Sequence, residues 1–231
     1  MDISIIIPAL NEEKYIGQCL ESISRQEFSG TYDVIVGDGM STDKTVAICE
    51  EYGAKVVIEP KHTISAGRAK ACKAAKGKII VSTDADIKAP KDWLEQVYSG
   101  FNGNVCTYGR IIPYDGSHLE KWVCENVMDK YLWFMDKVGK PVPIGSNLAF
   151  KRKAYEKIGG FNKNIITAED LELTKRLSEV GTIAYNPNSI VYVSMRRVRK
   201  WGYPKYIKFH VTNAIKYYRT GKSHDSYEPI R

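Results

Sequence analysis

The sequence predicts an α/β protein in which helices flank a mostly parallel central sheet. The first half alternates short apolar, β-branched runs with longer segments of helical periodicity, in the order strand, helix, strand, helix, strand, helix, strand. The short runs are apolar at consecutive positions, as expected for strands covered on both faces. A hydrophobic content of 43% is also sufficient for a core.

In the first half of the chain, the boundaries of the predicted strands and helices lie where the spacing of the apolar residues changes. Ser41 or Thr42 is predicted to cap the second helix, and Gly77 to follow the third helix. The predicted strands span residues 3–7, 34–36, 55–58 and 78–83. The predicted helices span residues 12–26, a segment containing Val46, Ile48 and Cys49, and residues 65–75.

The second half is less regular, but its elements can still be placed in order. Pro204 suits the first turn of a last, amphipathic helix. The predicted strands span residues 105–112, 147–150, 183–185 and 190–193. The other predicted helices span residues 93–98, 119–138, 152–158 and 168–180. Trp122, Trp133 and Phe134 on the long helix are interpreted as core residues or as the wall of an acceptor groove.

The basic excess of the chain is concentrated near its C-terminus. The formal net charge is +7, yet residues 1–180 hold 24 basic and 25 acidic side chains. Residues 181–224 hold nine basic side chains and no acidic one. The charge therefore indicates a basic segment over residues 196–231 that follows one domain over residues 1–195.

Several classes of protein are excluded or disfavoured by composition. No apolar stretch approaches the roughly 18 residues of a membrane-spanning helix, and the N-terminus does not have a signal-peptide pattern. Five widely spaced cysteines without a Cys-x-x-Cys pair predict reduced thiols and a cytoplasmic location. The four histidines do not have zinc-ligand spacing.

Polar clusters follow three of the predicted strands. Asn11 and Glu12 follow the first, Asp38 follows the second, and Asp84 and Asp86 follow the fourth. Each cluster alone could be a turn, a cap or a solvated loop. Together they would lie beyond the carboxyl ends of one parallel sheet, where such sheets bind ligands. Two carboxylates one residue apart can share a divalent cation with a diphosphate.

Five segments, in order, resemble the family 2 glycosyltransferases, which have the Rossmann-like GT-A fold. They are SIIIPALNEEKYIGQCLESISRQ, VIVGDGMSTDKT, GRAKACKAAKGKIIVSTDADI, IGSNLAFKRKAYEKIGGF and AEDLELTKRL. The resemblance implies a nucleotide-binding half over residues 1–100 and an acceptor half over residues 101–195. It also implies an inverting transfer of a sugar from a nucleotide-diphosphate sugar to an acceptor hydroxyl.

The resemblance also implies a role for each matching residue. Asp38 would contact the base of a UDP- or GDP-sugar, with UDP slightly favoured; Gly39 stands where the family usually has a second acid. Asp86 would be the nearer ligand of Mg²⁺ or Mn²⁺, and Asp84 would lie toward the ribose or sugar. Asp170 would be the catalytic base, with Glu169 beside it. Further nucleotide contacts would come from Pro8, Ala9, Asn11, Glu12 and Arg68, and donor or acceptor sugar contacts from Gly145, Ser146 and Asn147.

The basic segment has two anionic targets in this interpretation. Arg196, Arg197 and Arg199 would bind the donor diphosphate, because guanidinium groups pair with phosphate oxygens. The last helix either packs on the domain with a solvated basic face or lies on an anionic membrane. The second choice would hold the enzyme at the inner face of the membrane, near a lipid-linked acceptor; a glycan acceptor is the other possibility.

Three alternative functions stay open at this point. A polyprenyl- or dolichyl-phosphate sugar synthase has a phosphate acceptor and little need for a base. A nucleotidyltransferase would need a Gly-rich loop after the first strand, where this chain has Pro-Ala-Leu-Asn-Glu. A nucleic-acid-binding module would use the basic tail but leave Asp84, Asp86 and Asp170 without a role, so no nucleic-acid partner is expected.

Overall fold

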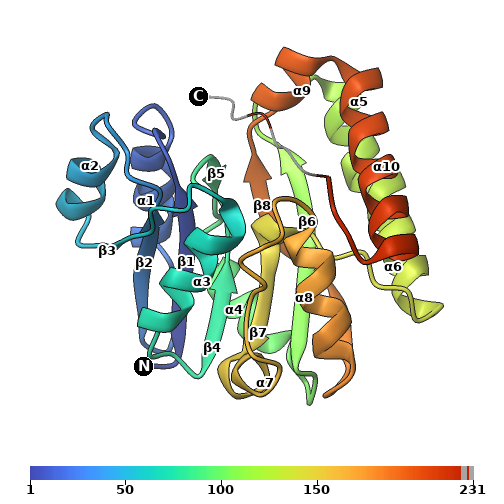
Figure 1. Cartoon of the computed structure of the whole chain (residues 1–231), viewed down its shortest axis with the longest axis horizontal. Helices are drawn as coiled ribbons and strands as arrows, with labels where there is room; N and C mark the ends of the chain where they lie inside the picture. The colour runs from blue at the N-terminus through green and yellow to red at the C-terminus, as the bar shows by residue number, and fades with distance from the viewer. Residues whose placement is uncertain (225–227, 229–231) are drawn as a thin grey trace.

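A single eight-stranded sheet forms the centre of the molecule in the computed structural model, which describes residues 1–224 and 228 (Figure 1). The strand order is β3-β2-β1-β4-β7-β6-β8-β5. The pairs β3–β2, β2–β1, β1–β4 and β6–β8 are parallel, and those involving β7 or β5 are antiparallel. The basic segment predicted over residues 196–231 includes residues 225–227 and 229–231, which lie outside the described residues.

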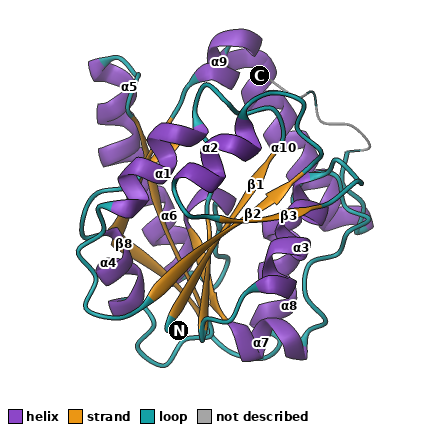
Figure 2. Ribbon diagram, turned by 90° about the vertical axis from the view of Figure 1, so that its left-hand side faces the viewer, coloured by secondary structure: helices purple, strands orange, loops and turns teal. Residues whose placement is uncertain are grey.

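The first half contains the predicted alternation of strands and helices. Its elements are β1 (Ile3–Ala9), α1 (Ile16–Ser24), β2 (Tyr32–Asp38), α2 (Thr45–Glu51), β3 (Lys55–Ile58), α3 (Ile64–Ala74) and β4 (Ile79–Ser82). The side chains of β1 explain its continuous apolar run. Ile5 and Ile7 pack in the core on one face of the sheet, while Ile6 packs in the core on the other. Figure 2 shows α1 and α4 on one side of the sheet and α3, α7 and α8 on the other.

The second half differs from the sequence prediction in several elements, among them a helix over Arg196–Trp201 that was not predicted. Its elements are β5 (Ile87–Lys88), α4 (Trp93–Ser99), β6 (Cys106–Pro113), α5 (His118–Trp122), η1 (Val123–Met128), α6 (Asp129–Lys137), η2 (Gly145–Asn147), β7 (Leu148–Lys151), α7 (Arg152–Lys157), α8 (Glu169–Ser178), β8 (Ile183–Val193), α9 (Arg196–Trp201) and α10 (Tyr203–Thr220). The short β5 was not predicted. The two predicted last strands are one strand with a shifted register, and the long helix contains the π-helical turn η1.

The predicted cap of α2 is wrong. The helix begins at Thr45, and the carboxylate of Asp43 accepts the hydrogen bond from the Thr45 backbone N–H at 2.9 Å. Ser41 instead donates to Asp38, and the backbone N–H of Thr42 donates to Asn11. The two residues are therefore part of the loop that faces the carboxyl end of the sheet.

The close packing of α3 against β2 depends on Gly37. A Cβ added at Gly37 would lie 2.2 Å from the backbone oxygen of Gly67. We expect Gly37→Ala to lower the free energy of unfolding by about 1–3 kcal/mol or more, because backbone atoms must shift to admit the methyl group. Gly17→Ala in α1 is the matched control, since its Cβ would meet Ile48 at an ordinary 3.6 Å. Urea unfolding of both variants checks this, and equal midpoints would contradict it.

The last helix packs on the domain by only one of its faces. Asn213 and Tyr217 are buried, and the Oγ1 of Thr167 donates a hydrogen bond to Asn213 at 3.0 Å. The apolar residues Ile207, Val211, Ile215 and Tyr218 are exposed. Trp122, Trp133 and Phe134 are 55%, 54% and 56% exposed, so the prediction that they are core residues is wrong, and the alternative that they line an acceptor groove stays a prediction.

Within the described part of the chain, none of the helices combines the length and apolar character that crossing a membrane requires.

Candidate functional site

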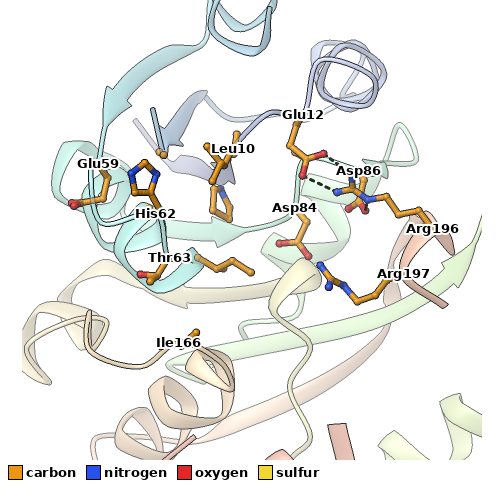
Figure 3. A pocket seen from close by; sticks show the side chains of 17 residues that line it. Leu10, Glu12, Glu59, His62, Thr63, Asp84, Asp86, Ile166, Arg196 and Arg197 are labelled. Atoms are coloured by element: carbon orange, nitrogen blue, oxygen red, sulfur yellow. Dashed lines mark hydrogen bonds and ion pairs between the residues drawn. The ribbon is translucent and has the colours of Figure 1, made fainter. Parts of the chain in front are cut away.

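A pocket of about 350 Å³ opens at the carboxyl ends of β1, β2 and β4 (Figure 3). Residues from the ends of all three strands line it, together with the start of α3 and the start of α9. The pocket thus lies where an open α/β sheet binds ligands. Of the predicted site residues, seven line it: Pro8, Ala9, Glu12, Asp84, Asp86, Arg196 and Arg197.

Arg68 connects the end of β4 with the start of α8. Its side chain is 3% exposed, and its NH2 group lies 2.6 Å from the Oδ1 of Asp84. Its NH1 group forms a second ion pair with Glu169. One buried guanidinium therefore binds both Asp84 and Glu169, which are 16 and 101 positions from Arg68 in the sequence. This arrangement links the predicted nucleotide and acceptor sides.

The carboxylate of Asp170 is fixed by two backbone N–H groups. Gly145 donates to its Oδ2 at 3.0 Å, and Leu171 donates to its Oδ1 at 2.8 Å. A Cβ at residue 145 would lie 2.8 Å from the Arg68 guanidinium. The glycine therefore leaves room for the arginine while its own N–H group binds Asp170. The N-terminus of α8 further favours negative charge at this point. The two hydrogen bonds thus hold the Asp170 carboxylate in one position.

The paired carboxyl groups at the start of α8 are difficult to ionise together. Burial raises the pKa of Glu169, and the charge of Asp170 adds to this, while Arg68 opposes it. Burial likewise raises the pKa of Asp170, opposed by Arg68 and by the two backbone N–H groups. A carboxylate with a raised pKa is a stronger base than an exposed one.

Arg196 occupies the opposite side of the pocket. Its Nε lies 2.7 Å from the Oδ2 of Asp86, and its NH1 lies 2.7 Å from the Oε2 of Glu12. The guanidinium also stacks on the ring of Tyr15, at 4.4 Å from the centroid. Burial raises the pKa of Asp86 to about 6, although Arg196 opposes the shift. Figure 3 shows the carboxylate of Asp84 directed toward the side of the pocket where Arg197 lies.

Asn11 joins the first two loops and Asp38 stabilises the second, and neither residue lines the pocket. Asn11 has a positive φ of 55° and accepts a hydrogen bond from the Thr42 backbone at 2.8 Å. Both carboxylate oxygens of Asp38 accept hydrogen bonds from Ser41. In this structure the two side chains therefore shape the rim of the pocket, and their predicted contacts with the nucleotide stay predictions.

Seven other predicted residues do not line the pocket. Four of them form the network around the buried guanidinium, Arg68, Gly145, Glu169 and Asp170, and the other three lie elsewhere. The Asn147 side chain accepts from the Trp93 indole at 3.0 Å, and the Ser146 carbonyl accepts from Thr83. Both residues are buried. Arg199 pairs with Glu120 at 2.7 Å, away from the pocket. The sugar contacts of Ser146 and Asn147 and the diphosphate contact of Arg199 are thus not assembled here.

Sequence reasoning missed ten residues of the pocket lining, among them four from loops that it did not consider. Glu59, His62 and Thr63 follow β3, and Ile166 precedes α8. The rule that directs attention to the end of each parallel strand applies equally to β3, and it would have identified Glu59. Ile166 comes from a loop distant in sequence, and no local pattern marks it.

The pocket lies at the ligand-binding edge of an open α/β sheet, and comparisons with known proteins identify the family. Residues 4–159 match the model of glycosyl transferase family 2. The chain belongs to this family, and it has the GT-A fold.

Similar proteins of known sequence are longer than this chain. Glycosyltransferase AglE of Haloferax volcanii is 28% identical over 78% of this chain and 62% of its own length. A poly(ribitol-phosphate) beta-glucosyltransferase of Bacillus spizizenii is 34% identical over 86% of this chain and 36% of its own length. The chain therefore spans less than two thirds of these relatives.

Solved structures agree with the fold. A mannosyltransferase from Pyrobaculum calidifontis, in complex with GDP-Man and Mn²⁺, superposes with a TM-score of 0.70 at 22% identity. The superposition covers 96% of this chain and 65% of that one. Residues 1–349 of S. aureus TarS in complex with UDP give 0.67 at 20% identity, over 87% of this chain and 62% of that one. These likenesses concern the fold.

Proposed function

We propose that the protein transfers a sugar from a UDP- or GDP-sugar to an acceptor hydroxyl, with inversion at the anomeric carbon. The observation that carries the proposal is that one buried arginine, Arg68, joins the pocket aspartate Asp84 to the acidic pair Glu169–Asp170. A donor bound over Asp84 would then have its anomeric carbon near a fixed carboxylate. Solved relatives that hold UDP, UDP-GlcNAc or GDP-Man support this donor class.

Asp170 is proposed to act as the general base. It would accept the proton of the acceptor hydroxyl as the oxygen attacks the anomeric carbon, and the nucleoside diphosphate would leave from the opposite face. Such proton transfer is worth about 10²–10⁴ in rate. Arg68 would keep Glu169 ionised as the proton arrives on its neighbour. Arg197 would contribute positive charge toward the departing diphosphate.

The aspartates at the end of β4 fit a divalent cation, Mg²⁺ or Mn²⁺. Asp84 is 38% exposed at the pocket, and Asp86 and Glu12 already accept a cationic group, the Arg196 guanidinium. Among residues 1–224 and 228, no group of three metal-ligating side chains is assembled. The remaining ligands would be phosphate oxygens and water, as Mg²⁺ prefers. When bound, the metal would stabilise the charge that develops on the leaving diphosphate.

The remaining assignments follow from this site. Residues 1–100 would bind the nucleotide, residues 101–195 would bind the acceptor, and residues 196–231 would form a basic segment that contacts anions. The acceptor would be a glycan or a lipid-linked molecule. A peripheral location at an anionic membrane surface would place the enzyme near a lipid-linked acceptor.

Nucleotide binding with and without a metal tests the proposal. We expect UDP or GDP to raise the melting temperature of the protein in the presence of Mn²⁺, and Asp86→Asn to lose most of the metal-dependent part. Asp92→Asn, an exposed aspartate on the same segment, is the control that should behave like the unchanged protein. Equal stabilisation of all three proteins, with or without Mn²⁺, would contradict the metal assignment.

A further inference from the structure

The exposed apolar side chains of this molecule are concentrated on two helical segments. Among the described residues, most exposed large hydrophobic side chains belong to α5–η1–α6 or to α10. Figure 1 shows both segments at the same end of the molecule, beyond β6 and β8. We call the group formed by six of them the two-helix surface. It consists of Trp122, Trp133, Phe134, Ile207, Val211 and Tyr218.

The two segments are fixed to each other at one end. The Tyr203 hydroxyl of α10 hydrogen-bonds to Glu120 of α5, and Arg199 pairs with the same carboxylate at 2.7 Å. Farther along, α10 is held against the segment just before α8 by the hydrogen bond that the Oγ1 of Thr167 donates to Asn213 at 3.0 Å. Thr167 precedes the start of α8, so α10 is anchored next to the helix that carries the proposed base, Asp170.

The charge on these helices is arranged for an anionic partner. Lys208 and Arg219 of α10 and Lys130 and Lys137 of α6 are exposed. The sequence of α10 contains no acidic residue. On α6, by contrast, the acidic side chains turn inward: both Asp129 and Asp136 accept hydrogen bonds from Tyr185. On the preceding segment Glu125 is exposed and Glu120 is paired with Arg199.

We propose that the two-helix surface docks on the interfacial region of an anionic lipid bilayer. Tryptophan and tyrosine are suited to the headgroup level, where one edge of the ring is apolar and the other wet. Aliphatic residues of α10 would enter the acyl boundary, while the flanking cations remain with the lipid phosphates. This docking would present a lipid-linked hydroxyl to Asp170, a step that rests on the proposed function.

Co-sedimentation of the full chain with vesicles tests the docking without any sugar donor. We expect binding to vesicles of phosphatidylglycerol and phosphatidylcholine, and little binding to phosphatidylcholine alone. Removing cations in Lys208→Gln/Arg219→Gln should weaken binding by about fivefold per cation. The matched control, Lys73→Gln/Lys157→Gln, removes the same charge from exposed positions elsewhere and should retain binding.

The apolar contribution is tested on each helix separately. Trp133→Glu/Phe134→Glu and Ile207→Glu/Val211→Glu should each weaken vesicle binding by about tenfold or more. Tyr52→Glu, at an exposed aromatic side chain just after α2, should not weaken it. Retained binding of UDP or GDP by each variant shows that the fold and donor site are intact, so a failure of docking is separable from a failure of the proposed function.

Three outcomes would overturn the inference. The first is equal binding to anionic and neutral vesicles, and the second is unchanged binding by both pairs of glutamate variants. The third is a different occupant of the surface. If the protein were a dimer and Trp133→Glu/Phe134→Glu converted it to a monomer, the occupant would be a second copy of the chain. If the protein bound only to vesicles that contain a polyprenyl phosphate, whatever the charge of the vesicles, the occupant would be a single lipid chain.

Discussion

Asp170→Asn is expected to slow transfer of sugar to a hydroxyl acceptor by about 10²–10⁴-fold. Asparagine has the shape of aspartate and its side-chain oxygen can still accept the 3.0 Å hydrogen bond from Gly145. It cannot accept a proton from the acceptor, so the effect should fall on kcat while the affinity for the donor changes little. Steady-state kinetics with a fixed acceptor and varied donor separate the two parameters.

The control for this substitution lies on the same helix segment. Glu179→Gln removes an exposed carboxylate at the end of α8 and should leave kcat within a factor of about two, since exposed substitutions have small effects. If Asp170→Asn transferred sugar to a hydroxyl at the rate of Glu179→Gln, the assignment of the base would be wrong. If only transfer to a phosphate acceptor were retained, the alternative synthase would be favoured.

The same base gives the reaction a specific pH dependence. Burial raises the pKa of Asp170 above its ordinary value of 3.8. The base must be deprotonated to act, so kcat should fall as the pH falls through the raised pKa rather than through the ordinary one. A pH profile of kcat shows this acidic limb, and the residual activity of Asp170→Asn should lack it. A profile whose acidic limb lies at the ordinary pKa of 3.8 or below it would contradict the proposed base.

Arg68→Gln should be the most destabilising substitution in the site. The guanidinium is 3% exposed and neutralises Asp84 and Glu169 together. Removing one partner of a buried ion pair costs about 3–5 kcal/mol, because the other charge is left without compensation. For a chain of this length we expect the melting temperature to fall by about 10 °C. Calorimetry or circular dichroism measures the change.

A matched arginine on the surface separates this effect from a general loss of charge. Arg25 pairs with Glu21, but the two side chains are 65% and 45% exposed. Arg25→Gln should therefore lower stability by less than about 1 kcal/mol. The double variant Arg68→Gln/Glu169→Gln should recover part of the loss, since it removes the uncompensated charge as well. Equal melting temperatures for Arg68→Gln and Arg25→Gln would show that the buried network is not stabilising.

The fold could be predicted from the sequence in those segments where the apolar residues recur with a single regular spacing. β1 is apolar at consecutive positions because Ile5 and Ile6 face two different cores, and α1 and α3 show equally simple patterns. The short β5 was missed because its two residues pair only with β8, which lies far away in the chain. The exposure of Trp133 could not be predicted either, since an aromatic stripe on a helix has the same sequence pattern whether or not something covers it.

The site was predictable to the extent that strand ends mark it. Glu12, Asp84 and Asp86 follow strands, and all three line the pocket. The ion pair of Arg196 with Glu12 joins residues 184 positions apart, and no local pattern predicts such a contact. The resemblance to the family placed Arg68 near the nucleotide, yet the structure shows it as the link between Asp84 and Glu169.

Release of nucleoside diphosphate from a panel of UDP- and GDP-sugars is the most direct test of this account. Release should need Mg²⁺ or Mn²⁺, a hydroxyl acceptor should stimulate it, and Asp170→Asn and Asp86→Asn should both reduce it. Release that is independent of metal and acceptor, or that is unchanged in both variants, would contradict it.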